Sequence, residues 1–202
     1  MTSIIKVNTI QDGGGNVLLT SNGSGSITTN NIGGQNTPAF QAYASGTMTI
    51  NDITWTKIAF NNDSGSDGSI MAFDEGGCYN DTSGTVTLNG ISTPSYSFAP
   101  NVAGKYKLTS FFAIDSADNN GHLFIGEILK NGNTSNGLMR FYWMKDPNNA
   151  TERQGIYLSA IVEANGTSDY FSVQGYADVG SGTSSVFTTN NFAFFAGEKL
   201  IT

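Results

Sequence analysis

The sequence has little of what most catalytic and metal sites need. Its 202 residues include one cysteine, Cys78, and one histidine, His122. One cysteine cannot form a disulfide within the chain, and one histidine cannot supply a multi-histidine metal centre. No serine lies in a nucleophile-elbow pattern, and two oxygen-rich loops, 61–68 and 115–120, lack EF-hand spacing. We therefore expect no enzyme activity, no catalytic residue, no metal and no cofactor.

Charge and long apolar runs are also scarce. Charged residues make up 12% of the chain, the formal net charge is −7, and the nine lysines and arginines are scattered. Without a basic stripe, binding to a nucleic-acid backbone is not expected. No apolar run reaches transmembrane length, and the first ten residues lack the apolar core of a signal peptide. We expect no membrane insertion, and the lone cysteine favours assembly in a cytoplasm.

What the chain does contain is the composition and periodicity of β structure. Glycine is abundant, aromatic residues make up 11%, and no window shows a sustained helical pattern. Around residues 105–114, Tyr106, Leu108 and Phe112 alternate with the polar Lys107. Period-two alternation predicts a central strand with one buried face.

Further strands are predicted on both sides of this one, at roughly even spacing. They cover residues 38–43, 55–60, 85–88, 122–130, 139–144, 155–164, 170–179 and 191–201, with a bent strand or loop at 73–79. Asn131-Gly132 between two apolar runs predicts a hairpin. Many short strands with little helix indicate a sandwich or jelly roll.

Residues 1–37 differ from the rest of the chain. Short apolar groups, among them Ile4, Ile5, Val7 and Ile10, are separated by glycine-rich turns. A single copy of this segment buries too little apolar area to offset its ordering entropy. It is either a floppy arm or a segment that becomes ordered beside other copies or on a larger assembly. We favour the second reading because a linker rarely contains so many aliphatic residues.

Four segments of the remaining chain carry a resemblance to a known family. They are PAFQA at 38–42, FAPNVAGKY at 98–106, ILKNG at 128–132 and FAGEKLI at 195–201. Their order and spacing resemble the trimeric jelly roll of the C1q and tumour-necrosis-factor superfamily. The resemblance spans residues 38–202 and implies an all-β, C1q/TNF-like jelly-roll sandwich that forms a homotrimer; the residues of 1–37 predict a short β-rich N-terminal arm before it. The long aromatic segment 133–153 departs from the family, so loop functions do not carry over.

The N-terminal segment TSIIKVNTIQD, residues 2–12, is similar to the start of many small virion proteins of tailed phages, especially marine and cyanobacterial ones. This resemblance implies an arm, residues 1–37, that attaches a knob, residues 38–202, to other virion proteins. The expected function is a bacteriophage virion structural protein, a homotrimeric short tail fibre with a host-surface-binding knob, assembled in the bacterial cytoplasm and located in the virion. The alternatives are a head fibre or capsid decoration protein and a soluble C1q-like binding module.

Three sets of candidate site residues follow from these expectations. The virion-attachment set is Ile4, Ile5, Val7 and Ile10, and the trimer-interface set is Tyr106, Phe111 and Phe195. In the strand at 139–144, alternation places Phe141 and Trp143 on one face and Arg140 and Tyr142 on the other, and either face could be the exposed one. Arginine, tyrosine and tryptophan carry much of the energy at interfaces. The receptor-binding candidates, for a host cell-surface glycan or protein, are Asn119, Asn120, His122, Arg140, Tyr142 and Trp143.

Overall fold

The computed structural model describes residues 7–24, 27–29, 36–62, 72–116, 121–135, 137–144, 153–180, 183–188 and 192–200. The chain divides into two compact units: the larger runs from Asn36 to Leu200, and the smaller contains the described residues before it. All elements of regular secondary structure in these ranges are strands, which confirms the all-β prediction. Within the same ranges, no helix has the length and apolarity to span a membrane.

The smaller unit is a sheet of three short strands. It has the order β1-β2-β3 and is antiparallel, with β1 at Thr9–Gln11, β2 at Val17–Ser21 and β3 at Ile27–Thr29. The carboxylate of Asp12 accepts hydrogen bonds from the backbone N–H groups of Gly14 and Asn16, both at 2.9 Å, and so closes the first turn. None of residues 7–24 is buried, so this part of the sheet has no core of its own.

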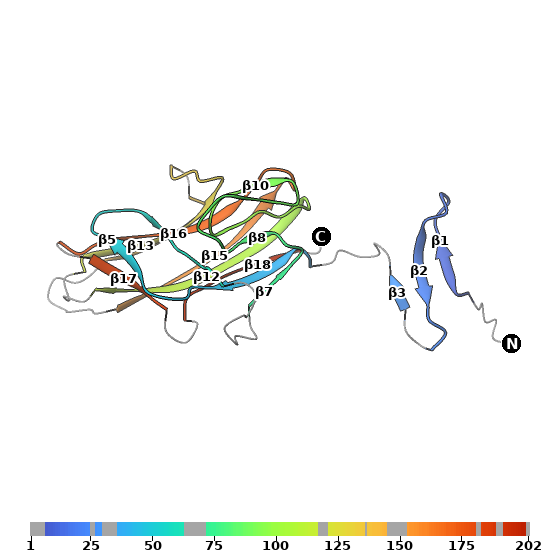
Figure 1. Cartoon of the computed structure of the whole chain (residues 1–202), viewed down its shortest axis with the longest axis horizontal. Helices are drawn as coiled ribbons and strands as arrows, with labels where there is room; N and C mark the ends of the chain where they lie inside the picture. Colours follow the sequence, from blue (N-terminus) through green and yellow to red (C-terminus); the bar gives the residue numbers. More distant parts are fainter. Residues whose placement is uncertain are drawn as a thin grey trace. The chain divides into compact units, whose positions relative to one another are not determined.

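The larger unit is a sandwich of two antiparallel sheets (Figure 1). The first has six strands, in the order β14-β13-β16-β11-β8 with β6 also paired to β16; the second has seven, in the order β5-β17-β12-β18-β4-β7 with β15 also paired to β12. A separate hairpin joins β9 to β10. The strands are β4 Ala39–Tyr43, β5 Met48–Asn51, β6 Thr56–Lys57, β7 Phe73–Glu75, β8 Tyr79–Asn80, β9 Val86–Leu88, β10 Ile91–Thr93, β11 Ser97–Phe98, β12 Gly104–Ser116, β13 Leu123–Lys130, β14 Met139–Met144, β15 Arg153–Ala164, β16 Phe171–Asp178, β17 Thr183–Phe187 and β18 Phe194–Lys199.

The central strand of the seven-stranded sheet is β12, as its alternation predicts. One edge pairs with β15 along almost its whole length, and the other edge is shared by β18 and β17. Tyr106, Leu108 and Phe112 are fully buried, whereas Lys105 and Lys107 are exposed, so the predicted division of faces is confirmed.

The core lies between the two sheets and is rich in aromatic rings. The ring of Phe40 on β4 stacks on Tyr79 and Phe98, with centroids 4.6 and 4.5 Å apart, and meets Phe195 edge-on at 4.9 Å. Such offset and edge-on contacts add to the free energy gained by burying the rings. These residues come from β4, β8, β11 and β18, so the cluster ties together strands of both sheets.

A pair of glycines lets the sheets approach closely. Gly126 on β13 lies opposite Gly175 on β16. A Cβ atom at Gly126 would lie 2.4 Å from Ile156 and 2.9 Å from the ring of Phe112, both of the other sheet. Glycine is therefore required there by packing rather than by backbone conformation.

Some predicted elements differ from the observed ones. Only Thr56–Lys57 of the predicted strand 55–60 pairs in a sheet, and β5, β10, β11 and β17 were not expected. In β17 the inward positions include Ser184, which hides the apolar alternation. Asn131 and Gly132 have positive φ angles of 54° and 67°, as the predicted turn requires. The hairpin from β13 to β14 is confirmed, but its loop is longer than this turn.

Candidate binding site on the six-stranded sheet

The outward face of the six-stranded sheet gathers polar and aromatic side chains around β14. In the pairing of β13 with β14, Arg140 lies opposite Glu127 and Tyr142 lies opposite Ile125. The intervening Phe141 packs on the core. The sequence prediction that Arg140 and Tyr142 share one face and Phe141 and Trp143 the other is confirmed, and the first pair lies on the outward side.

Beneath this face lies a buried carboxylate with a complete set of partners. Glu127 has no exposed surface. Its Oε1 accepts hydrogen bonds from Nε and Nη2 of Arg140 at 3.1 and 2.6 Å, and its Oε2 accepts one from Nε2 of Gln174 at 2.9 Å. A buried charge is tolerated only when it is paired and hydrogen-bonded in this way. Hydrogen bonds from the guanidinium to Tyr142 and to Glu127 raise the pKa of Arg140 above its ordinary value.

Arg140 also lies between two aromatic rings. Its Cζ is 5.4 Å from the centroid of the Trp55 ring and 5.8 Å from that of Tyr142, and its Nη1 donates to the Tyr142 hydroxyl at 3.0 Å. Trp55 in turn lies beside Tyr176 of β16, with centroids 5.2 Å apart. We call these four side chains, Tyr176, Trp55, Arg140 and Tyr142, the aromatic row. Tyr142 is 56% exposed and Trp55 is also exposed, so ring surface in the row faces solvent.

Glycine at position 137 is part of the same arrangement. A Cβ atom at Gly137 would lie 1.5 Å from Oε1 of Glu127, which is closer than any real contact. The backbone of the β13–β14 loop therefore passes directly over the carboxylate and helps to shield it from water. Next to it, the N–H of Leu138 donates to the carbonyl of Ile128 at 2.9 Å and holds the loop against β13.

Two other predicted receptor-binding residues, Trp143 and His122, lie apart from the aromatic row. Trp143 points to the opposite side of the sheet, where its ring stacks on Phe124 at 5.6 Å and packs against the core, so this candidate lies on the inward of the two faces. His122 is exposed just before β13, where its backbone N–H donates to the carbonyl of Asp178 at 2.7 Å. Asn119 and Asn120 lie outside the described residues.

Two of the predicted virion-attachment residues, Val7 and Ile10, lie in the described part of the smaller unit. Val7 is 49% exposed and Ile10 of β1 is 45% exposed. Ile4 and Ile5 lie outside the described residues. The two described members of the set thus present aliphatic surface to solvent, which is compatible with attachment but does not test it.

Two of the three predicted trimer-interface residues lie in the core of a single chain. Tyr106 and Phe195 are fully buried, and the hydroxyl of Tyr106 donates to the carbonyl of Val102 at 2.6 Å. Their side chains cannot meet a second copy, so this assignment is corrected: their apolar face is the one that packs on the other sheet. Phe111 points outward, where its ring meets that of Phe192 at 5.1 Å, and its interface role stays a prediction.

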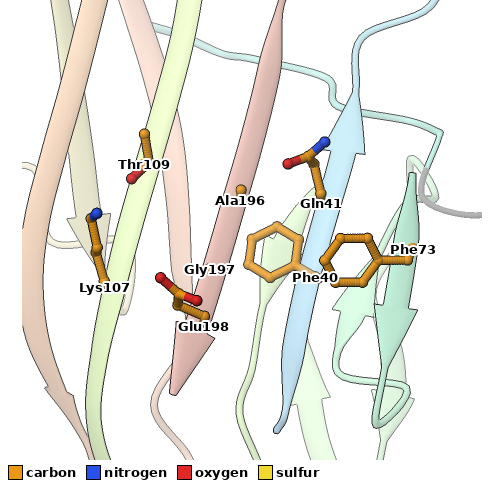
Figure 2. A pocket seen from close by; sticks show the side chains of 8 residues that line it. All are labelled: Phe40, Gln41, Phe73, Lys107, Thr109, Ala196, Gly197 and Glu198. Carbon is orange, nitrogen blue, oxygen red and sulfur yellow. The ribbon is translucent and has the colours of Figure 1, made fainter. Parts of the chain in front are cut away.

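The outward face of the seven-stranded sheet is partly apolar and carries a shallow recess. Tyr157 and Ile161 of β15 are 55% and 69% exposed. Across the same sheet lies a recess of about 190 Å³. Its lining comprises Lys107 and Thr109 on β12, Ala196, Gly197 and Glu198 on β18, Phe40 and Gln41 on β4, and Phe73 on β7 (Figure 2). Mixed polar and apolar groups of this kind suit contact with another protein surface.

In the described ranges, no three His, Cys, Asp or Glu side chains come together as a possible metal site. The arrangement around Glu127 and Arg140 positions hydrogen-bond donors and aromatic rings at a surface. The carboxylate of Glu127 is itself sealed from solvent, so the groups that this arrangement turns outward are N–H donors and aromatic rings.

Sequence reasoning missed several members of this site. Trp55, Tyr176 and Gln174 are distant from β14 in sequence, and the pairing of Thr56 with Gly175 is what brings the first two together. One signal was present: Glu127 is the single carboxylate inside the apolar run LFIGEIL, and a lone acid in a two-sided apolar strand needs a partner.

Comparisons with known proteins support the fold. No protein-family model matches the chain, and no curated protein sequence matches it. Among solved structures, murine APRIL at pH 5.0 is similar, with a TM-score of 0.52, 10% identity and coverage of 80% of this chain and 98% of that chain. The Eiger TNF from S. frugiperda is similar too, with a TM-score of 0.50, 10% identity and coverage of 80% and 91%. The larger unit is thus a C1q/TNF-like jelly-roll sandwich, as the resemblance implied.

Proposed function

We propose that this chain is a homotrimeric virion protein of a tailed bacteriophage, a short tail fibre whose larger unit contacts the host surface and whose smaller unit attaches to the particle. The role is one of binding and assembly, without catalysis. The observation that carries the proposal is the contrast between the two units: a TNF-like sandwich with a full core, and a three-stranded sheet with no buried residue among residues 7–24.

The smaller unit supports the attachment role because it is incomplete as a folded body. A sheet of three short strands needs a covered hydrophobic face to be stable. In this unit the aliphatic side chains of Val7 and Ile10 are exposed to solvent. Contact with other copies or with another virion protein would supply the missing burial. The similarity of residues 2–12 to the start of phage virion proteins points to the same partner.

The larger unit supports self-association through the outward face of its seven-stranded sheet. Tyr157, Ile161 and Phe192 expose large apolar side chains there. Apolar groups on one face commonly mark an interface. In a closed threefold ring, each contact joins two different surfaces of neighbouring copies. The exposed apolar side chains of one copy can therefore meet the recess lined by Phe73 and Gln41 on the next copy.

The threefold association is tested by light scattering coupled to size-exclusion chromatography. The full chain should elute with three times the protomer mass, and Ile161→Asp should elute as a monomer because a carboxylate would be desolvated at the contact. Thr87→Asp, an exposed position on β9, is the matched control and should remain associated. A monomeric parent protein would reject the trimer.

The location is tested on particles of the phage that encodes the chain. Antibody labelling in electron micrographs should mark the tail, and Val7→Asp with Ile10→Asp should abolish incorporation. Labelling of the head would instead show a head fibre or decoration protein. If the particles do not contain the protein, the virion role is rejected and the soluble C1q-like binding module is the remaining alternative.

A further inference from the structure

The aromatic row has a feature that a purely structural surface does not need: exposed aromatic rings lie beside an ion pair whose carboxylate is fully buried. Arg140 is fixed by Glu127, which is fixed in turn by Gln174, and the rings of Trp55 and Tyr142 flank the guanidinium. Replacing a buried ion pair by apolar residues is often neutral or stabilising, so the pair is not needed for stability alone. A network of this kind instead holds surface groups in one geometry.

We propose that the aromatic row binds a neutral pyranose ring of a host-surface glycan, an inference that rests on the proposed host-binding function. The C–H face of the sugar would pack on the exposed ring surfaces of Trp55 and Tyr142, because aromatic faces are apolar and electron-rich. The sugar hydroxyls would meet the polar tips of the row. These are the Tyr142 hydroxyl, which can still donate, and the N–H groups of Arg140 that Glu127 and Tyr142 do not use.

The charges in the site favour a neutral ligand over an anionic one. The positive charge of Arg140 is compensated at 2.6 Å by a carboxylate that is itself buried. The remaining N–H groups therefore act as hydrogen-bond donors rather than as a free cation for a phosphate or carboxylate. The formal net charge of −7 also repels polyanions.

The polarity of the row favours a glycan over a protein partner. Stable protein interfaces have a hydrophobic centre from which charged residues are depleted, surrounded by a polar rim. Here the order is reversed, since the ion pair of Arg140 with Glu127 lies at the centre and the rings flank it. Alternation of flat rings with donors fits the alternation of C–H faces and hydroxyls on a sugar.

The test uses the full-length protein on a glycan array that carries neutral and anionic glycans, with mannan and dextran as soluble neutral probes and heparin as the polyanion. Neutral glycans should bind and heparin should not. Trp55→Ala and Tyr142→Ala should each weaken binding about tenfold through loss of ring contact. Tyr142→Phe should lose less than Tyr142→Ala, and Thr87→Ala on β9 should bind as the parent does.

A direct readout is available because the chain has two tryptophans, Trp55 in the row and Trp143 against the core. In Trp143→Phe, the emission of Trp55 should change when the bound neutral glycan is added and stay constant with heparin. Binding only to anionic glycans, no binding to any neutral glycan, or neutral binding that Trp55→Ala leaves unchanged would each overturn the inference.

Failure of the inference differs from failure of the proposed function. If purified full-length protein blocks phage adsorption yet binds no neutral glycan, the host-binding role stands with a receptor of another kind and the glycan inference is overturned. If particles lack the protein while neutral glycans bind through Trp55, the sugar site stands and the virion role is overturned.

Discussion

The guanidinium of Arg140 and the carboxylate of Glu127 are bound at 2.6 Å, although Glu127 is sealed from solvent and Arg140 reaches the surface. Removing the arginine leaves an uncompensated charge inside the protein. We expect Arg140→Ala to lower the free energy of unfolding by about 3 kcal/mol. Urea denaturation at one fixed protein concentration measures this, since association adds a concentration-dependent contribution.

The matched control is Arg153→Ala, which removes the exposed ion pair of Arg153 with Asp115 at 2.7 Å. That loss should stay below about 1 kcal/mol because water screens the pair. The double variant Glu127→Leu with Arg140→Met should be more stable than Arg140→Ala, since no charge is left unpaired. If Arg140→Ala and Arg153→Ala lost the same free energy of unfolding, burial of Glu127 would not be what makes the Arg140 pair important.

A second prediction concerns Gly137. Gly137→Ala places a methyl group where Oε1 of Glu127 lies, so either the loop or the carboxylate has to move. We expect a loss of roughly 2–3 kcal/mol in the free energy of unfolding. Gly84→Ala, where a Cβ atom meets nothing within 4 Å, is the control and should change stability little. Thermal unfolding of both variants in parallel decides the point, and a Gly137→Ala protein as stable as its parent would show that the loop is adaptable there.

A third prediction separates core from interface at Phe195. Its ring lies among those of Phe40, Phe60 and Tyr79 within one chain. Phe195→Ala should therefore lower the free energy of unfolding by about 3–5 kcal/mol. The protein that remains folded should keep the parent's oligomeric state in light scattering. If Phe195→Ala were instead a stable, folded monomer, Phe195 would belong to the subunit interface after all.

A fourth prediction concerns acid stability. Burial alone would raise the pKa of Asp169, but hydrogen bonds from Lys130, Asn131 and the backbone of Asn165 together hold it below its ordinary value of 3.8. An acid whose folded-state pKa is lowered stabilises the fold above its unfolded pKa. That stabilisation is lost as the pH falls below 3.8 through the lowered value.

The midpoint of urea denaturation, measured at a series of pH values from neutral to below 3.8, reports this contribution to stability. Asp169→Asn should be less stable than the parent at neutral pH, and the difference should shrink in the acid range. Glu163→Gln, a change at an exposed neighbouring carboxylate, should follow the parent's profile. A constant difference between Asp169→Asn and the parent at every pH would show that the carboxylate's charge is not what matters.

Much of the fold could be predicted because one face of several strands is buried. The alternation in β12 and β14 predicted the positions of these strands and the division of their faces. The same pattern could not tell which neighbour the apolar face meets. Tyr106 and Phe195 were therefore assigned to a second copy, although the second sheet of the same chain covers them.

The candidate site was predictable only where its residues are neighbours in sequence. Arg140 and Tyr142 are two positions apart on one strand, so alternation places them together. Trp55 and Tyr176 join them through the pairing of β6 with β16, which no local pattern encodes. The short β6 carries too few residues for a period to be read from it.

The pairing of β12 with β18 means that the central strand can be completed only late in synthesis of the chain. Tyr106 bonds in register with Lys199, so the central strand has an open edge until the ribosome has released residues 194–199. The β1–β2–β3 sheet, by contrast, closes among neighbours that are synthesised first. An open strand edge templates intermolecular pairing, and distant pairings form slowly. Premature termination before β18 would therefore leave an unpaired edge on the central strand, through which truncated chains would aggregate.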